Sequence, residues 1–200
     1  MGFVPRFHEF HCWEISVGVP MKALAISGFV FALGLSMAVA ADAPLKGFSH
    51  DNKTEISGYY MPVKPITVGK FTLENLSIGG LDDLKKYETG KGRIPTYAPV
   101  MFVFQDTTSK KLKNEMGDDY YANEPRVLPA AYRIRGNTIA FEGKDRQVGA
   151  VSFTGTIDPK IVKALMDQGI MDTDKIVIKG DLTIAGKVFK GVNFRWFGGD

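Results

Sequence analysis

Cysteine is almost absent from this sequence, since its 200 residues contain only Cys12. A single cysteine excludes an intramolecular disulfide framework and a cysteine-rich metal site. An excess of one charge is also missing: 25 Lys and Arg stand against 22 Asp and Glu, and a net charge of +3 gives no basis for nucleic-acid binding. Hydrophobic residues at 44% and charged residues at 24% are ordinary globular values, which exclude a disordered, collagen-like or coiled-coil chain.

Histidine, the usual proton acceptor of nucleophilic enzymes, is scarce. Of the 3 histidines, only His50 lies beyond residue 20. It stands in the polar segment FSHDNKTE, a pattern typical of a solvated loop, with Ser49 and Asp51 too close in sequence to form a triad with it. The G-x-S-x-G and glycine-rich phosphate-binding motifs are missing as well. We therefore predict no catalytic residues and no cofactor.

Residues 21–40 have the pattern of a secretory signal peptide. Lys22 provides a positive start, the run that follows it to Ala40 carries no charge, and Ala38 and Ala40 supply the small side chains that signal peptidase accepts. An uncleaved membrane anchor is the alternative, because an apolar run of this length can just span a bilayer. The small-residue ending favours cleavage, and we expect a periplasmic or secreted protein with no membrane span in the mature chain.

Residues 1–20 precede this leader and are predicted to be a start-site extension, with translation beginning at Met21. They contain His8, His11 and Cys12, whose spacing imitates a metal site. A closed zinc site normally takes four ligands. Only these three are present, so we expect no metal.

Strand patterns dominate residues 41–200, which we predict to be a single exported β-rich domain. Apolar side chains alternate along 176–184, a turn follows at Gly186, and the alternation returns along 188–196, as in a hairpin with one face on a core. Residues 100–104 (VMFVF) are apolar throughout, which is typical of a central buried strand. Further strand patterns cover 54–61, 66–78, 131–141 and 148–157. The expected fold class is all-β: an antiparallel sandwich or barrel of about seven strands with one or two short helices.

Two short helices are expected between the strands. Asp158 and Pro159 are suited to be the cap and first residue of one, and Gly169 ends it by accepting a left-handed conformation. The other is Leu81–Glu88, which has an apolar stripe and is followed by Gly90. Both are expected to close ends or corners of the β-structure.

Paired carboxylates are a catalytic device that needs no sequence motif. Glu115, Asp118, Asp119 and Glu124 lie close together in the sequence. Neighbouring acids more often form a solvated surface. A carboxylate-pair hydrolase acting on envelope glycan is therefore an alternative and not the main prediction.

The segment Gln105–Pro129 stands out because connections of this length tend to be functional or to carry structure of their own. Its first part has the pattern of one or two helical turns, capped by Ser109 and ended by Gly117. Its second part, GDDYYANEPRVLP, sets Tyr120 and Tyr121 among charged residues. Tyrosine suits recognition because it joins a flat apolar ring to a hydroxyl, but it is also common in edge strands that cover a core. The candidate ligand-binding residues are Asp118, Asp119, Tyr120, Tyr121 and Arg126.

Three functions remain open from the sequence. The leading hypothesis is a non-catalytic exported β-domain that binds an unidentified component of the cell envelope. The alternatives are the carboxylate-pair hydrolase and a carrier that holds a lipid-like ligand in an apolar barrel interior. A filled core with an exposed aromatic loop would favour the binding domain. A buried acid pair in a cleft would favour the hydrolase, and an empty apolar barrel would favour the carrier. No feature indicates a nucleic-acid partner or an oligomeric state.

Overall fold

The computed structural model describes residues 45–199. The chain divides into two units, Met1–Ala41 and Asp42–Asp200, and the described residues belong to the second. The predicted start-site extension and signal peptide, with the two histidines and the cysteine of the former, lie outside the described residues. Within them, no helix is long and apolar enough to cross a membrane.

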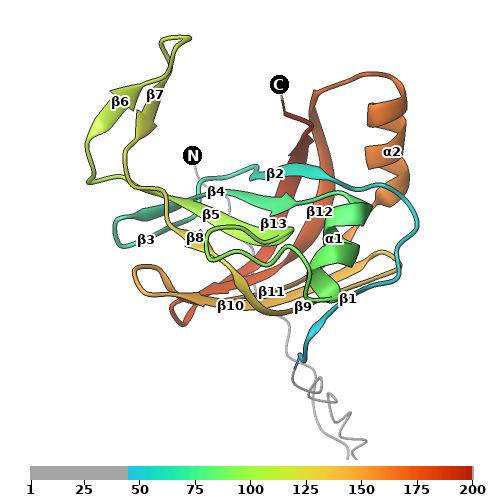
Figure 1. The fold of residues 1–200 in the computed structure, drawn as a ribbon. Coiled ribbons are helices and arrows are strands. Elements are labelled where there is room, and N and C mark those ends of the chain that lie inside the picture. The colour runs from blue at the N-terminus through green and yellow to red at the C-terminus, as the bar shows by residue number, and fades with distance from the viewer. Residues whose placement is uncertain (1–44, 200) are drawn as a thin grey trace, which may run out of the picture. The chain divides into compact units, whose positions relative to one another are not determined.

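Strands make up most of the described domain, which confirms the predicted fold class, and they form an 11-stranded sheet (Figure 1). The order along the sheet is β1-β9-β10-β11-β12-β13-β2-β4-β5-β8, and β3 pairs with β4 beside this path. The bounds are β1 Phe48–His50, β2 Gly58–Pro62, β3 Thr67–Val68, β4 Phe71–Ile78, β5 Val100–Asp106, β8 Arg126–Val127, β9 Pro129–Arg135, β10 Thr138–Asp145, β11 Gly149–Ile157, β12 Asp172–Ile184 and β13 Lys187–Phe197. Neighbours are antiparallel except β1 and β9, which are parallel.

The sheet curls into a half-barrel (Figure 1), which is consistent with the predicted antiparallel sandwich or barrel. β8 pairs with β5, and β9, which follows it directly after Leu128, pairs with β10. The continuous stretch 126–135 therefore connects β8, at one end of the sheet, to β9, the second strand from the other end. The structure has more strands than the about seven expected, and the additional ones are mainly short, such as β1 with 3 residues and β3 with 2.

Glycines let an aromatic ring cross the strands where the sheet curls. Gly155 on β11 and Gly180 on β12 are directly opposite each other. A Cβ atom on Gly155 would lie 2.5 Å from Cζ of Phe153, and one on Gly180 would lie 2.6 Å from the same atom. The ring of Phe153 therefore takes the space of two side chains, and only glycine fits beneath it.

Large side chains fill the inside of the curl. The largest fully buried aromatic residues are Trp196, Tyr60, Tyr132, Phe102, Phe104, Phe141, Phe153 and Phe194. The ring centroid of Phe102 lies 5.0 Å from that of Phe141 and 5.9 Å from that of Phe153, so aromatic contacts join β5 to β10 and β11. The indole of Trp196 is satisfied as well, because its Nε1 donates to the carbonyl of Ser57 at 2.9 Å.

Both predicted helices are present. α1 spans Leu81–Glu88 and α2 spans Pro159–Asp167. The carboxylate of Asp158 accepts hydrogen bonds from the backbone N–H groups of Lys160 and Ile161 at 3.0 and 3.3 Å, which is the expected cap. In Figure 1 the helices lie on the right, away from a two-stranded hairpin that projects at the upper left.

Candidate functional site

The projecting hairpin is the segment that the sequence singled out. β6 (Lys111–Lys113) and β7 (Asp119–Tyr121) form a separate two-stranded sheet, with Leu112 opposite Tyr120. The prediction of helical turns ended by Gly117 is therefore wrong. The side chain of Asn114 accepts from the backbone N–H of Asp118 at 2.8 Å, and Gly117 adopts φ 90°. These features make a tight turn that pairs the flanking residues as strands.

Asp106, the last residue of β5, anchors the base of this hairpin. Its side chain is buried and accepts hydrogen bonds from Lys70 Nζ at 2.8 Å, Thr108 Oγ1 at 2.7 Å and Asn123 Nδ2 at 3.1 Å. These bonds, with that from the Lys70 ammonium the largest influence, hold the pKa of the Asp106 carboxyl well below its usual range. One carboxylate thus ties both ends of the hairpin segment to the turn that precedes β4.

The predicted site residues on the hairpin have different surroundings. Tyr120 is 39% exposed, whereas Tyr121 is half-buried, with Lys111 Nζ lying 5.5 Å from its ring centroid. Asp118 accepts a hydrogen bond from Asn114 Nδ2 at 3.1 Å, and Asp119 forms an ion pair with Lys113 Nζ at 2.9 Å. The two exposed carboxylates therefore bond within the hairpin itself.

A surface hollow of about 490 Å³ lies beside the hairpin. Tyr120, Tyr121 and Arg126 line it, together with Glu124 and Asp145. We call it the hairpin hollow. The structure thus brings together both predicted tyrosines and the predicted arginine, whereas Asp118 and Asp119 are not among the lining residues.

A second hollow lies on the outer face of the sheet, and the strand register places its residues. Phe102 and Phe104 belong to the core cluster inside the curl, so Val103 between them points outward. Val103 is paired with Asn75 on β4 and with Arg126 on β8. Cross-strand partners share a face of the sheet. Asn75, Val103 and Arg126 therefore form one row on the outer face.

A neighbouring row on the same face consists of Tyr59, Ser77 and Met101, paired in that order. Met101 and Val103 are only 6% and 7% exposed although neither belongs to the core cluster. They form the floor of a hollow of about 500 Å³ lined by both rows and by Glu74, Tyr97 and Glu124. We call this hollow the bulge cleft.

The bulge cleft takes its name from an irregularity in β4. Its register against β5 shifts between Leu73 and Asn75, which makes Glu74 an extra residue in the strand. A β-bulge of this kind re-aims side chains and is frequent beside functional sites. Here it sets the side chains of Glu74 and Asn75 next to each other at the bulge cleft.

Two carboxylates and a guanidinium meet in the bulge cleft. Glu74, Glu124 and Arg126 all line it, and Glu124 and Arg126 also line the hairpin hollow. Burial raises the pKa of Glu74, and the negative charge of Glu124 raises it further, against the lowering effects of a hydrogen bond with Gln105 and of Arg126. The cleft therefore holds an acid pair in which one carboxyl is held toward its protonated form.

Asn75 contributes a polar atom without a partner. The residue is 7% exposed, and no described residue donates a hydrogen bond to its Oδ1. A buried polar atom left without a partner typically costs about 1–3 kcal/mol. The fold thus carries an unsatisfied acceptor where the strand register directs its side chain outward.

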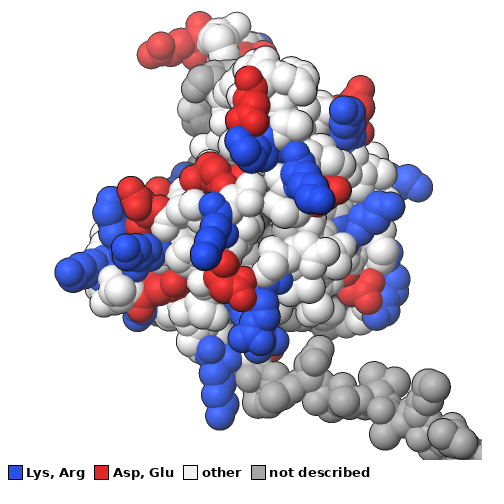
Figure 2. All heavy atoms as spheres, turned by 90° about the vertical axis from the view of Figure 1, so that its right-hand side faces the viewer, with Lys and Arg blue, Asp and Glu red and all other residues white. Residues whose placement is uncertain are grey.

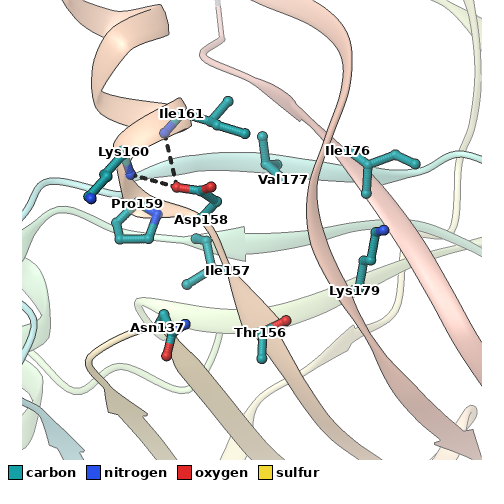
Figure 3. Close-up of a pocket in the computed structure, with 10 residues that line it drawn as sticks. All are labelled: Asn137, Thr156, Ile157, Asp158, Pro159, Lys160, Ile161, Ile176, Val177 and Lys179. Atoms are coloured by element: carbon teal, nitrogen blue, oxygen red, sulfur yellow. Dashed lines mark hydrogen bonds between the residues drawn. The ribbon is translucent and has the colours of Figure 1, made fainter.

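A third hollow, of about 540 Å³, lies where α2 leaves β11 (Figure 3). Lys160 and Lys179 line it beside the apolar residues Ile157 and Ile176. The start of α2 is not free for a ligand, because the carboxylate of Asp158 already accepts from two of its N–H groups, as the dashed lines in Figure 3 show. These two backbone N–H groups are therefore used within the fold.

His50 is not the solvated loop residue that its sequence context predicts. It lies in β1, its side chain is 15% exposed, and its Nδ1 is 2.8 Å from Glu88 Oε1. The hydroxyl of Tyr132 donates to the same oxygen at 3.2 Å. Burial, followed by the charge of Glu88, raises the pKa of Tyr132. The pairing of β1 with β9 draws His50 into this network, which joins both strands to the end of α1.

Positive and negative side chains are interspersed over the face seen in Figure 2, so that face has no patch of one sign. Among residues 45–199, no group of three or more His, Cys, Asp or Glu side chains is arranged to hold a metal ion. No protein-family model, curated protein or solved structure matches this chain. The candidate sites therefore rest on the geometry of the described residues.

Glu74, Asn75 and Asp106 are not predicted as site residues from the sequence. A local signal for the bulge exists, because the apolar alternation of β4 runs through Leu73 and resumes at Leu76 instead of one residue earlier. Asp106 has a weaker signal, as an acid that ends an apolar strand. Nothing local indicates that residue 75 pairs with residue 103 and that residue 103 pairs with residue 126.

Proposed function

We propose that this protein is exported to the periplasm or the cell exterior and that its β-domain is a non-catalytic module that binds a component of the cell envelope. The observation that carries the proposal is the projecting β6–β7 hairpin. It presents Tyr120 and Tyr121 beside Arg126 in one hollow. These three side chains are of the types that dominate recognition surfaces.

The construction of the hairpin supports a binding role. The buried Asp106 carboxylate bonds to Thr108 and Asn123, near the two ends of the hairpin segment. An arm that is already held in place loses less conformational entropy when it binds a partner. The large side chains inside the curl give no support to the alternative of a lipid-like ligand carried there.

The proposal can be tested by comparing three forms of the protein as bait in envelope extracts: wild type, the double variant Tyr120→Ala/Tyr121→Ala, and Val188→Ala. Val188 is a matched control because it is exposed and apolar but lies in β13, outside the lining of the hairpin hollow. We expect one component to be retained by wild type and Val188→Ala and lost from the double variant. Equal retention by all three forms would contradict recognition by the hairpin.

Thermal unfolding of the single variants separates recognition from core covering. Tyr120→Ala is expected to change the unfolding free energy by no more than about 0.5 kcal/mol, because this ring is largely at the surface. Tyr121→Ala is expected to cost more, since its half-buried ring lies beside Lys111. A large loss for both variants would mean that both rings cover the core.

Export is supported by the leader pattern at residues 21–40. We expect intact-mass analysis of the accumulated protein to give a chain that begins at Ala41, recovered in the soluble envelope fraction. A species that keeps residues 21–40 and remains with the membrane would contradict this part of the proposal.

A second candidate function is hydrolysis of envelope glycan by a carboxylate pair, and the bulge cleft is the observation that favours it. Glu124, one of the acids considered from the sequence, lines this cleft with Glu74, whose raised pKa suits a general acid. If this function is correct, the wild-type protein releases reducing ends from envelope glycan. The variants Glu74→Gln and Glu124→Gln both lose this release. Release that persists in either variant would exclude the pair as its cause.

A further inference from the structure

The unpaired oxygen of Asn75 is the feature of the bulge cleft that most directly indicates a ligand. The side chain is more than nine-tenths buried, and no described residue donates to its Oδ1. It faces the cleft because its cross-strand partner Val103 points outward. Buried polar atoms in native proteins nearly always have a partner. Oδ1 has almost no exposed surface in the free protein, so a hydroxyl or amide group of a bound molecule would supply the missing donor once the Asn75 side chain turns toward it.

The charges around Asn75 restrict what that molecule can be. The raised pKa of Glu74 favours its neutral form, and the opposite charges of Glu124 and Arg126 then offset each other, so the lining favours neither an anion nor a cation. A neutral group with several hydroxyls satisfies both signs. Each hydroxyl can donate to a carboxylate or to Asn75 Oδ1 and can also accept from the guanidinium of Arg126.

The apolar parts of the cleft suit a ring. Met101 and Val103 form a buried floor, and Tyr59, 42% exposed, and Tyr97 line the cleft as well. Tyrosine presents a flat apolar face together with a hydroxyl, so it can contact the carbon face of a ring that carries hydroxyls at its rim. The volume of about 500 Å³ lies within the usual range of small-molecule pockets, about 300–1,000 Å³.

We propose that the bulge cleft is a binding site for a neutral, polyhydroxylated ring of the kind that a sugar residue presents. This is the cleft of the second candidate function, but sugar binding there requires no hydrolysis. It also requires no partner at the hairpin tyrosines, although Glu124 and Arg126 line both hollows. Asn75 and Glu124 accept hydrogen bonds from ring hydroxyls, Arg126 donates to them, and Glu74 takes part in either protonation state. Tyr59 and Tyr97 contact the ring's carbon face.

The experiment is a titration followed by amide chemical shifts, with the protein in the form that the cell accumulates. The probes are glucose, galactose, mannose and N-acetylglucosamine, with inorganic phosphate and agmatine as charged comparisons. We expect at least one of the four sugars to give saturable shifts confined to the residues that line the bulge cleft, around Asn75, Val103 and Arg126. Saturable shifts there with phosphate or agmatine and none with a sugar, or none with any probe, overturn the proposal.

Variants then test which atoms bind. Asn75→Ala removes no hydrogen bond made to Asn75 Oδ1 within the fold and relieves the cost of its unpaired burial. The variant is therefore expected not to lower the melting temperature and to weaken sugar binding by at least about tenfold. Arg126→Gln replaces an exposed side chain and is expected to weaken sugar binding in the same way, so it serves as the test if Asn75→Ala does not fold. Glu142→Gln is the matched control, because Glu142 is an exposed acid on β10 that lines neither the bulge cleft nor the hairpin hollow. Unchanged affinity in Asn75→Ala and Arg126→Gln overturns the assignment.

The hairpin variant separates this site from the proposed envelope-binding function. Tyr120→Ala/Tyr121→Ala is expected to leave sugar-induced shifts unchanged, since neither tyrosine lines the bulge cleft. Loss of the envelope component with retention of the sugar supports two sites. Loss of the sugar in the double variant would contradict a separate site in the cleft.

Discussion

The two faces of β4 and β5 differ in how their side chains affect the stability of the fold. On the inner face, Leu76 and Phe102 are fully buried in an apolar core. On the outer face of the same strands, Asn75 keeps an unpaired buried oxygen and Glu74 has a raised pKa. The inner face gains stability from every contact, whereas the outer face carries groups that cost stability in the free protein. Such costs are characteristic of sites that bind or react.

The strongest test of the inner face is Trp196. Its side chain is 2% exposed and donates a hydrogen bond to Ser57, so Trp196→Ala is expected to lower the unfolding free energy by about 3–5 kcal/mol in urea titrations. Phe197→Ala is the matched control, because Phe197 is the next residue along β13 and is only partly buried. Equal losses in the two variants would remove the contrast between the faces.

Asp106 tests how firmly the hairpin is attached. Asp106→Asn is expected to lower the melting temperature at neutral pH and to speed amide exchange at Thr108 and Asn123, because the charge-assisted bond from Lys70 is lost. The folded carboxyl has a lowered pKa, so its stabilisation is present above its ordinary value of 3.8 and is lost as the pH falls through the folded value. The difference between variant and wild type should therefore shrink in acid.

Asp118→Asn is the control for this prediction, since Asp118 lies in the exposed turn at the far end of the hairpin. It is expected to leave exchange at the hairpin base unchanged. If the two variants behaved alike, Asp106 would not be the anchor.

Glu74 is expected to have a smaller effect on stability than Asp106, and its pH dependence has the opposite sign. Its pKa is raised in the folded protein, so the folded state holds the proton more tightly than the unfolded chain, and stability falls as the pH rises above the ordinary value of 4.5. Glu74→Gln is therefore expected to be more stable than wild type at neutral pH and equal to it at low pH. Urea titrations at several pH values measure this, and a variant less stable at every pH would rule out a destabilising charge at Glu74.

Local patterns predicted the inner face well and the outer face poorly. The alternation along β12 and β13 and the Asp158 cap of α2 require only neighbouring residues, and both were found from the sequence. The bulge cleft depends on the register that sets Asn75 beside Val103 and Arg126, and that register is decided by long-range pairing. Tyr120, Tyr121 and Arg126 were identified by residue type, but their shared hollow was not predictable from it.

The central claim is that Asn75 serves a ligand and not the fold, and its neighbour Leu76 offers the most direct comparison. The two residues are adjacent in β4 and similarly buried, but they face opposite sides of the sheet. Urea unfolding should show a loss of about 2–5 kcal/mol for Leu76→Ala. Asn75→Ala should show no loss, because it removes a buried unpaired oxygen that costs about 1–3 kcal/mol in the free protein. Comparable losses in the two variants would contradict the claim, because Asn75 would then be a structural residue.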